Sequence, residues 1–146
     1  MSLPEFEIWQ HRVTKIRLRT NTNPSYVGGY CGMNVYTNYV EQGWFGDLGL
    51  DASQYSTILD WNINGMNEVI LSVTFCFKVF GLGGLTVETN QNIYSFDGGS
   101  SQPCDSYTVS GFQLVGILGH GLWCISYMGA HFEKCLAGKC SPKSLH

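Results

Sequence analysis

The sequence is poor in charge, in strong helix formers and in long apolar runs. Charged residues make up 13% of its 146 residues, and the formal net charge is −3. Such a charge gives no overall attraction to nucleic acid or acidic membranes, so neither is an expected partner. No apolar run of about 18 residues or more occurs, which predicts no membrane-spanning helix. Because Ala, Glu and Lys are scarce, a mainly helical protein is also disfavoured.

Motifs of the common enzyme classes are missing as well. The chain has no G-x-S-x-G, no HExxH, no G-x-x-x-x-G-K and no C-x-x-C. Its four histidines lie far apart, and the spacing of His131, Cys135, Cys140 and His146 fits no usual zinc site. We therefore expect a non-enzymatic protein without a metal or another cofactor.

The N-terminus has no basic region followed by an apolar one, so no signal peptide is predicted. Six cysteines are nevertheless present, and an even number favours an oxidising compartment. They permit many full pairings, among which the sequence does not choose. Because the loop between them is short, Cys135 and Cys140 are the candidate disulfide pair. On this ground we expect a secreted or lumenal protein.

Strand-favouring residues are plentiful, and apolar and polar positions alternate along much of the chain. The most regular run, Glu68–Phe80, predicts a long half-buried strand, or two strands that share a bend. Further strands are predicted over Val13–Arg19, Met33–Val40, Ser56–Trp61, Leu85–Thr89 and Ile93–Phe96, with a turn at Gln42–Leu50 and a break at Gly81–Gly84. We predict one all-β domain over residues 1–146, with its core at about 12–132 and an irregular tail at 133–146.

Three cations share one face of the first predicted strand. Lys15, Arg17 and Arg19, here called the basic stripe, alternate with the apolar Ile16 and Leu18. The plainer interpretation of this pattern is a solvated strand face. The alternative is a stripe that binds an anionic ligand.

The stretch from Ser110 to Phe132 is typical of a β-hairpin. Its predicted strands are Phe112–Leu118 and Trp123–Phe132, and the loop between them consists of Gly119, His120, Gly121 and Leu122. Because glycine allows close backbone approach, this loop can present bare N–H groups to a ligand.

Several spaced segments resemble jacalin-related lectins, close in style to the animal zymogen-granule members. They are VTKIRLRT (13–20), WFGDLG (44–49), GGLTVETNQNIYSF (83–96) and the hairpin run from Val115 to Gly129. The resemblance implies a type I β-prism, with three four-stranded antiparallel Greek-key sheets around one core. It also implies a non-catalytic, metal-independent carbohydrate-binding module.

The chain departs from this family where the family contacts sugar. The family carries a carboxylate at the end of a G-x-x-x-D loop. Alignment on Gly121 places Ile125 there, and alignment on Gly129 places Ser126 there. The segment Leu3–His11 also stands in place of the family's N-terminal Gly-Gly loop. We therefore expect a divergent or weakened glycan site.

The hairpin loop still holds candidate sugar contacts. Hydroxyl groups could be bound by His120, by the N–H groups of Gly121 and Leu122, and by Ser126, while Trp123 offers an aromatic face. The alternative for Leu122 and Trp123 is that they fill the end of the core.

Two other functions remain open. One is a protein-interaction or targeting domain that has kept the fold and lost sugar binding. The other is a glycosaminoglycan binder that uses the basic stripe. The expected partner is thus a glycan or glycoprotein, with a sulphated glycan as the variant. Sugar identity, homo-oligomerisation and membership of a larger chain stay undecided.

Overall fold

The computed structural model describes residues 12–21, 30–46, 55–78, 81–97, 103–120, 125 and 127–135. All regular structure within these ranges is β-strand. None of the described segments forms a helix long and apolar enough to cross a membrane. The strands are β1 (Val13–Asn21), β2 (Tyr30–Thr37), β3 (Val40–Phe45), β4 (Tyr55–Asn62), β5 (Ile70–Lys78), β6 (Gly81–Thr89), β7 (Ile93–Asp97), β8 (Cys104–Thr108), β9 (Phe112–His120) and β10 (Tyr127–Lys134).

The first four strands form a Greek key. Their order in the sheet is β4-β1-β2-β3, so the fourth strand returns to lie beside the first. All neighbours are antiparallel, and Leu18 of β1 lies between Leu59 of β4 and Met33 of β2. The alternation read from the sequence holds, because Ile16 and Leu18 are fully buried. The basic stripe occupies the outer face of the same strand.

The next four strands repeat this topology in the order β7-β6-β5-β8. The run Glu68–Phe80 contains the single strand β5, and the strands predicted over Leu85–Thr89 and Ile93–Phe96 pair as the β6–β7 hairpin. Among the residues that the structure describes, the two sheets join where Tyr30 of β2 lies opposite Leu82 of β6.

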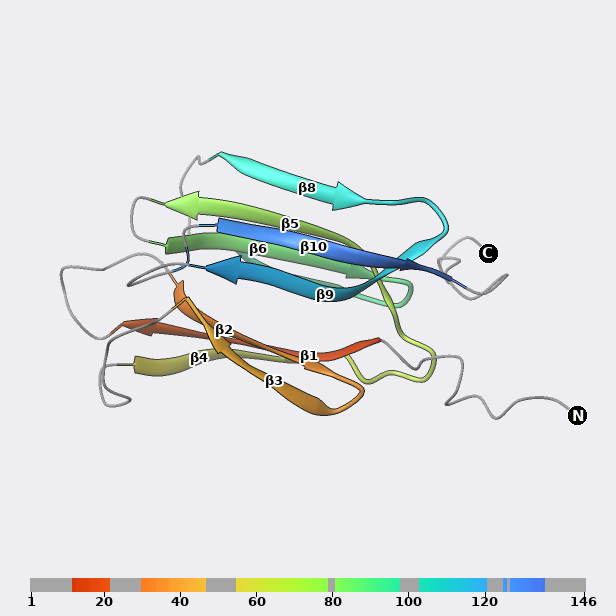
Figure 1. The fold of residues 1–146 in the computed structure, drawn as a ribbon, viewed down its shortest axis with the longest axis horizontal. Coiled ribbons are helices and arrows are strands. Elements are labelled where there is room, and N and C mark those ends of the chain that lie inside the picture. The colour runs from red at the N-terminus through yellow and green to blue at the C-terminus, as the bar shows by residue number, and fades with distance from the viewer. Residues whose placement is uncertain are drawn as a thin grey trace, which may run out of the picture.

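The last two strands, β9 and β10, form a separate antiparallel hairpin. In Figure 1 this hairpin is drawn over β5 and β6, and β9 contacts β5 of the second sheet as well as β1 and β2 of the first. Three antiparallel groups of strands thus enclose one interior, which confirms the predicted all-β prism. Among the described residues this third sheet has two strands.

One apolar core connects the three sheets. Its largest fully buried side chain is that of Phe75 in β5. Other members come from each sheet in turn: Ile16, Met33, Leu82, Leu85, Leu114, Ile117 and Met128. Removal of this surface from water, worth about 25 cal/mol per Å² of apolar area, is the main term that holds the sheets together.

The β2–β3 hairpin corrects the strand predicted over Met33–Val40. That segment turns at Asn38 and Tyr39, whose φ angles are 51° and 68°. Two consecutive residues in the left-handed region are the geometry of a tight two-residue hairpin turn. The chain then returns as β3 through part of Gln42–Leu50, the segment predicted as a turn.

The start of β6 corrects the break predicted at Gly81–Gly84, since these glycines lie within the strand. A Cβ on Gly84 would come within 3.3 Å of both Cys76 Cβ and the Phe96 carbonyl oxygen. Gly84 is therefore needed for close packing between neighbouring strands, and it does not terminate the strand.

Candidate functional site

The β9–β10 hairpin extends further than the sequence predicts. His120 pairs with Tyr127, and Gly119 pairs with Met128. Gly119 and His120 are therefore strand residues, and their prediction as loop residues is wrong. The second strand begins at Tyr127 where the sequence predicted Trp123. Further ladder bonds keep the backbone extended, because paired strands satisfy more N–H and C=O groups than an open loop does.

Four of the candidate sugar contacts lie outside the described residues: Gly121, Leu122, Trp123 and Ser126. The connection to which they belong lies between the end of β9 and the start of β10. Figure 1 shows both at the same end of the molecule as the end of β5 and the start of β8.

Ile125, within this connection, belongs to the core. Its side chain is fully buried and joins the central apolar cluster. It packs on the backbone of Gly46, directly after β3, where an added Cβ would lie 2.6 Å from Ile125 Cγ1 and 2.7 Å from the Cys31 carbonyl oxygen. A side chain enclosed in this way offers no surface to a ligand.

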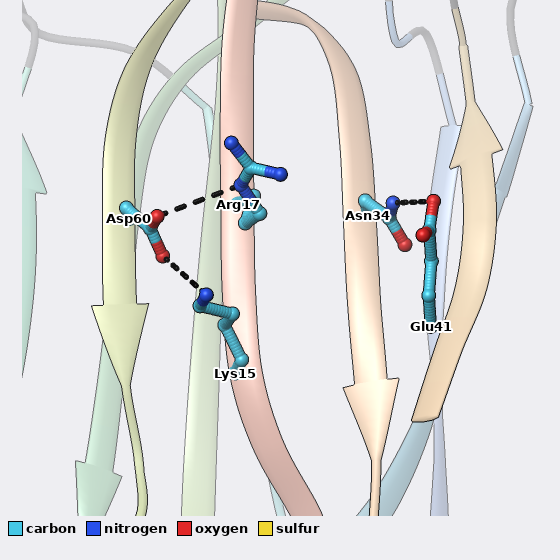
Figure 2. Close-up of polar contacts among 5 residues, drawn as sticks. All are labelled: Lys15, Arg17, Asn34, Glu41 and Asp60. Atoms are coloured by element: carbon cyan, nitrogen blue, oxygen red, sulfur yellow. Dashed lines mark hydrogen bonds and ion pairs between the residues drawn. The ribbon is translucent and has the colours of Figure 1, made fainter. Parts of the chain in front are cut away.

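A carboxylate on β4 borders the basic stripe. Lys15 Nζ lies 3.6 Å from Asp60 Oδ1, and Arg17 Nε lies 3.5 Å from Asp60 Oδ2 (Figure 2). The side chains of Lys15 and Arg17 are each 29% exposed, and that of Asp60 is 42% exposed. Pairs with this much solvent access contribute at most about 1 kcal/mol each. Their main effect is to offset part of the positive charge on this face.

Aromatic rings hold the same cations against the sheet. Lys15 Nζ lies 5.2 Å from the ring centre of Tyr36. The guanidinium carbons of Arg19 and Arg17 lie 3.8 Å and 5.8 Å from the ring centre of Trp44. Rings at these distances attract cations through their negative faces. Sequence reasoning missed the contribution of Trp44, because its strand was read as a turn.

A second carboxylate lies on the other side of the stripe, on β3. Asn34, opposite Arg17 in the β1–β2 pairing, is fully buried. Its amide donates to Glu41 Oε1 at 2.7 Å (Figure 2) and accepts from the Gly43 N–H at 3.1 Å. The outer face of this sheet therefore combines three cations with the two carboxylates of Asp60 and Glu41.

A buried carboxylate that sequence reasoning missed lies at the opposite end of the prism from the β9–β10 connection. Glu68 is 1% exposed. Its Oε2 accepts from Thr89 Oγ1 at 2.7 Å, from the Tyr94 hydroxyl at 2.9 Å and from Asn92 Nδ2 at 3.1 Å. Its Oε1 accepts from the Gly65 N–H at 3.0 Å. The sequence signal is weak, since Glu68 is only the polar first residue of the most regular alternating run.

These contacts set the ionisation of Glu68. Burial alone raises the pKa, but hydrogen bonds from Thr89, Asn92, Gly65 and Tyr94 outweigh burial and hold the pKa below its ordinary value of 4.5. Burial and the bond to Glu68 raise the pKa of the Tyr94 hydroxyl to about 12. The carboxylate is thus ionised and fully engaged by protein donors, which makes it a structural anchor.

Arg12 forms further hydrogen bonds at the end of the prism that contains Glu68. Its Nη1 donates to the backbone carbonyl oxygens of Glu68 at 2.7 Å and Gly65 at 3.1 Å. Its Nη2 donates to the Tyr39 hydroxyl at 2.9 Å. The beginning of β1, the β2–β3 turn and the loop before β5 are thereby tied together.

The described cysteines are all disulfide-bonded. Cys76 of β5 is joined to Cys104 of β8. Cys31 and Cys135 are also in disulfides, while Cys140, the predicted partner of Cys135, lies outside the described residues. In the part of the chain that the structure covers, no three His, Cys, Asp or Glu side chains gather to hold a metal ion.

Comparison with protein families identifies the chain. Residues 5–131 match the family model described as the jacalin-like lectin domain, and the chain belongs to this family. The match spans the three sheets and the connection between β9 and β10. No curated protein matches the sequence.

Solved structures share the fold at low sequence identity. The prostate-specific WGA16 glycoprotein lectin is 20% identical, with a TM-score of 0.65, and the match covers 87% of this chain and 86% of that one. Jacalin in complex with melibiose is 15% identical, with a TM-score of 0.62, and the match covers 84% and 92%. PirB is 13% identical, with a TM-score of 0.67; the match covers 92% of this chain but 32% of PirB, so there the fold forms part of a larger protein. The resemblance read from the sequence is thus confirmed for the family and the fold.

Proposed function

We propose that this chain is a non-catalytic carbohydrate-binding module that contacts glycans through the connection between β9 and β10. Membership of the jacalin-like lectin family carries this proposal. The antiparallel hairpin that holds the connection supports it, because a rigid pair of strands fixes where the connecting residues lie. The expected contacts are the His120 ring, the backbone N–H groups of Gly121 and Leu122, and the side chains of Trp123 and Ser126.

We further propose that this site is weakened relative to the family pattern. The burial of Ile125 favours the alignment on Gly129, in which Ser126 stands at the position of the family's carboxylate. A neutral, short hydroxyl replaces a charge-assisted acceptor, and such bonds are worth roughly 1.5–3 kcal/mol. Affinity for a monosaccharide should then be no better than millimolar, about −4 kcal/mol.

Titration calorimetry with methyl-mannoside and methyl-galactoside tests this proposal. Wild-type chain should bind at millimolar concentration or more weakly, and Ser126→Asp should strengthen binding at least about tenfold. Ser110→Asp is the matched control, because it adds the same charge at an exposed turn between β8 and β9. Low-micromolar affinity of the wild type, or an equal gain from both variants, would contradict the weakened site.

The basic stripe supports a second candidate, a sulphated glycan bound on the outer face of the first sheet. Three cations in a row on β1, held in place by Tyr36 and Trp44, suit a chain of sulphate groups. Asp60 opposes it, since it pairs with both Lys15 and Arg17.

A salt series separates this second candidate from the first. Binding of a sulphated disaccharide at the stripe should weaken as salt rises. Asp60→Asn, which removes the competing carboxylate, should strengthen it several-fold, whereas Asp105→Asn on exposed β8 should not. Affinity that changes neither with salt concentration nor with Asp60→Asn would exclude the basic stripe as the binding site.

A glycan array distinguishes both candidates from the remaining one, a protein-interaction or targeting domain without glycan affinity. We also propose a secreted or lumenal location, which the disulfide between Cys76 and Cys104 supports. Thiol counting on denatured, unreduced protein from its natural source checks the location. A full set of free thiols would contradict it.

A further inference from the structure

Strand β8 is an exposed edge strand that a disulfide joins to its neighbour β5. It is the last strand of its sheet, paired with β5 alone among the described strands. All five of its residues are exposed, and the Tyr107 ring contacts the core only from the surface side of Phe75. Its disulfide joins Cys104 to Cys76, the residue directly opposite in the β5–β8 pairing. The covalent bond therefore crosses a single strand pair at the start of an edge strand.

Besides its backbone pairing with β5, β8 has side-chain contacts that lie at the solvent-exposed surface. Thr74 Oγ1 and Ser106 Oγ are 2.8 Å apart, and Thr108 Oγ1 donates to the Leu71 carbonyl oxygen at 3.1 Å. The ring of Tyr107, at 37% exposure, packs against Phe75. Edge contacts of this kind open more easily than buried ones. The disulfide is thus the strongest link between β8 and the rest of the sheet.

The described cysteines differ sharply in access. Cys31 is fully buried, and Cys135 is half-buried. Cys104 is exposed and lies on the outer edge strand. Thiol–disulfide exchange requires that a thiolate reach a sulfur of the bond, so access selects which bond reacts. Of these three cysteines, only Cys104 is exposed to a reductant in solution.

We propose that Cys76–Cys104 is a thiol–disulfide exchange site for a dithiol reductant, and that its opening releases β8 from β5. One thiolate of the dithiol attacks Cys104 Sγ, which breaks the bond to Cys76 and leaves Cys76 as the thiolate. The second thiol of the reductant then attacks the mixed disulfide and frees Cys104. Two electrons and two protons pass to the protein, and the dithiol becomes a disulfide.

Opening this bond changes the edge of the sheet. The disulfide closes a segment in which its cysteines are 28 residues apart, and this segment contains β6 and β7. Without the bond, the entropy of the freed chain favours detachment of β8. β5 would then become the sheet edge, with backbone groups of the Ser72–Cys76 segment open to another strand. This inference does not depend on glycan binding.

Limited reduction of the folded wild-type chain tests the proposal. The protein is treated with low dithiothreitol, quenched with an alkylating agent and mapped by peptide mass spectrometry. Cys76 and Cys104 should be labelled together, well before Cys31 and Cys135. Equal or earlier labelling of Cys31 or Cys135, or no labelling until the whole chain unfolds, would overturn the exchange site.

Hydrogen exchange of the partly reduced protein tests the release of β8. Amides of residues 104–108 should exchange at least about tenfold faster, while those of β1 and β2 stay protected. Unchanged hydrogen exchange in β8 after the disulfide is reduced would overturn the release.

The variant Cys76→Ser/Cys104→Ser should reproduce the exchange pattern of the reduced protein. Thr74→Val/Ser106→Ala is the matched control, because it removes a neighbouring side-chain bond and should leave β8 protected while the disulfide is intact. If the serine variant does not fold, the reduced wild type decides the question alone.

Discussion

Glu68 couples ionisation to stability at a single residue. Glu68→Gln should lower the free energy of unfolding by about 2 kcal/mol at neutral pH, because a charge-assisted acceptor with four donors is lost. The folded-state pKa lies below the ordinary 4.5, so the stabilisation is complete above that pH and is lost as pH falls through the lowered value. Urea unfolding at neutral pH and at steps into the acid range measures both effects.

The difference in free energy of unfolding between wild type and Glu68→Gln should therefore decrease as the pH falls. Glu88→Gln serves as the control, because Glu88 is an exposed carboxylate on the neighbouring β6. It should change stability by no more than about 0.5 kcal/mol. An equal loss from the two variants would mean that the buried contacts of Glu68 do not stabilise the fold.

Substitutions at Gly46 and Gly43 distinguish the cost of backbone strain from the cost of steric overlap. Both have positive φ angles, +92° and +99°, but an added Cβ at Gly46 would overlap Ile125 and the Cys31 carbonyl, whereas Gly43 has nothing within 4 Å. Gly43→Ala should cost about 1 kcal/mol for the backbone alone. Gly46→Ala should cost at least about 2 kcal/mol more, since the core must move. Thermal unfolding measures the two, and equal losses would rule out close packing at Gly46.

At the level of the element, the β2–β3 turn depends on Asn38. Asn38→Ala should destabilise by about 1–2 kcal/mol, because alanine is strained at a φ of 51° and the Oδ1 acceptor for the Arg12 N–H is lost. Asn38→Gly also loses that acceptor but tolerates the angle, so it should cost less. Denaturant unfolding of both variants gives the comparison. A larger loss for glycine would show that the angle is not the constraint.

The same turn marks how far the elements could be predicted. Alternation located most strands, because one buried face demands an apolar residue at every second position, as in β1 and β5. It failed at Asn38–Tyr39, because neither residue is glycine and the tyrosine contacts Arg12, directly before β1, and Thr14 in β1. It failed again at Gly84, whose role depends on its neighbours across the sheet.

The candidate site was predicted less completely than the fold. The sequence identified the hairpin and the basic stripe, since both follow from local alternation. It did not predict that Gly119 and His120 belong to a strand, because ladder length depends on the partner β10. Asp60 and the partners of Glu68 were missed because they come from other parts of the chain, and Trp44 was missed because its strand was read as a turn.

At the scale of the whole molecule, the three sheets share one core and should unfold together. Leu114 of β9 is fully buried in that core. Leu114→Ala should lower the free energy of unfolding by about 2–5 kcal/mol. The unfolding transitions followed by circular dichroism and by tryptophan fluorescence should shift by the same amount. Two of the fluorescent residues, Trp44 and Trp61, lie in the first sheet, far along the chain from Leu114. Separate transitions for the two signals would show that the third sheet unfolds on its own.

Arg12 and Cys135, the first and last described residues, lie at one end of the prism. Arg12 bonds to the loop before β5, and the Cys135 N–H donates to Gly111 in the turn between β8 and β9. The connection from β9 to β10 lies at the other end, as Figure 1 shows. A tether attached through residue 12 or 135 would therefore point the β9–β10 connection away from its support. Several copies anchored in this way would present their connections on the same side, and the weak contacts proposed for each would combine into a higher overall affinity.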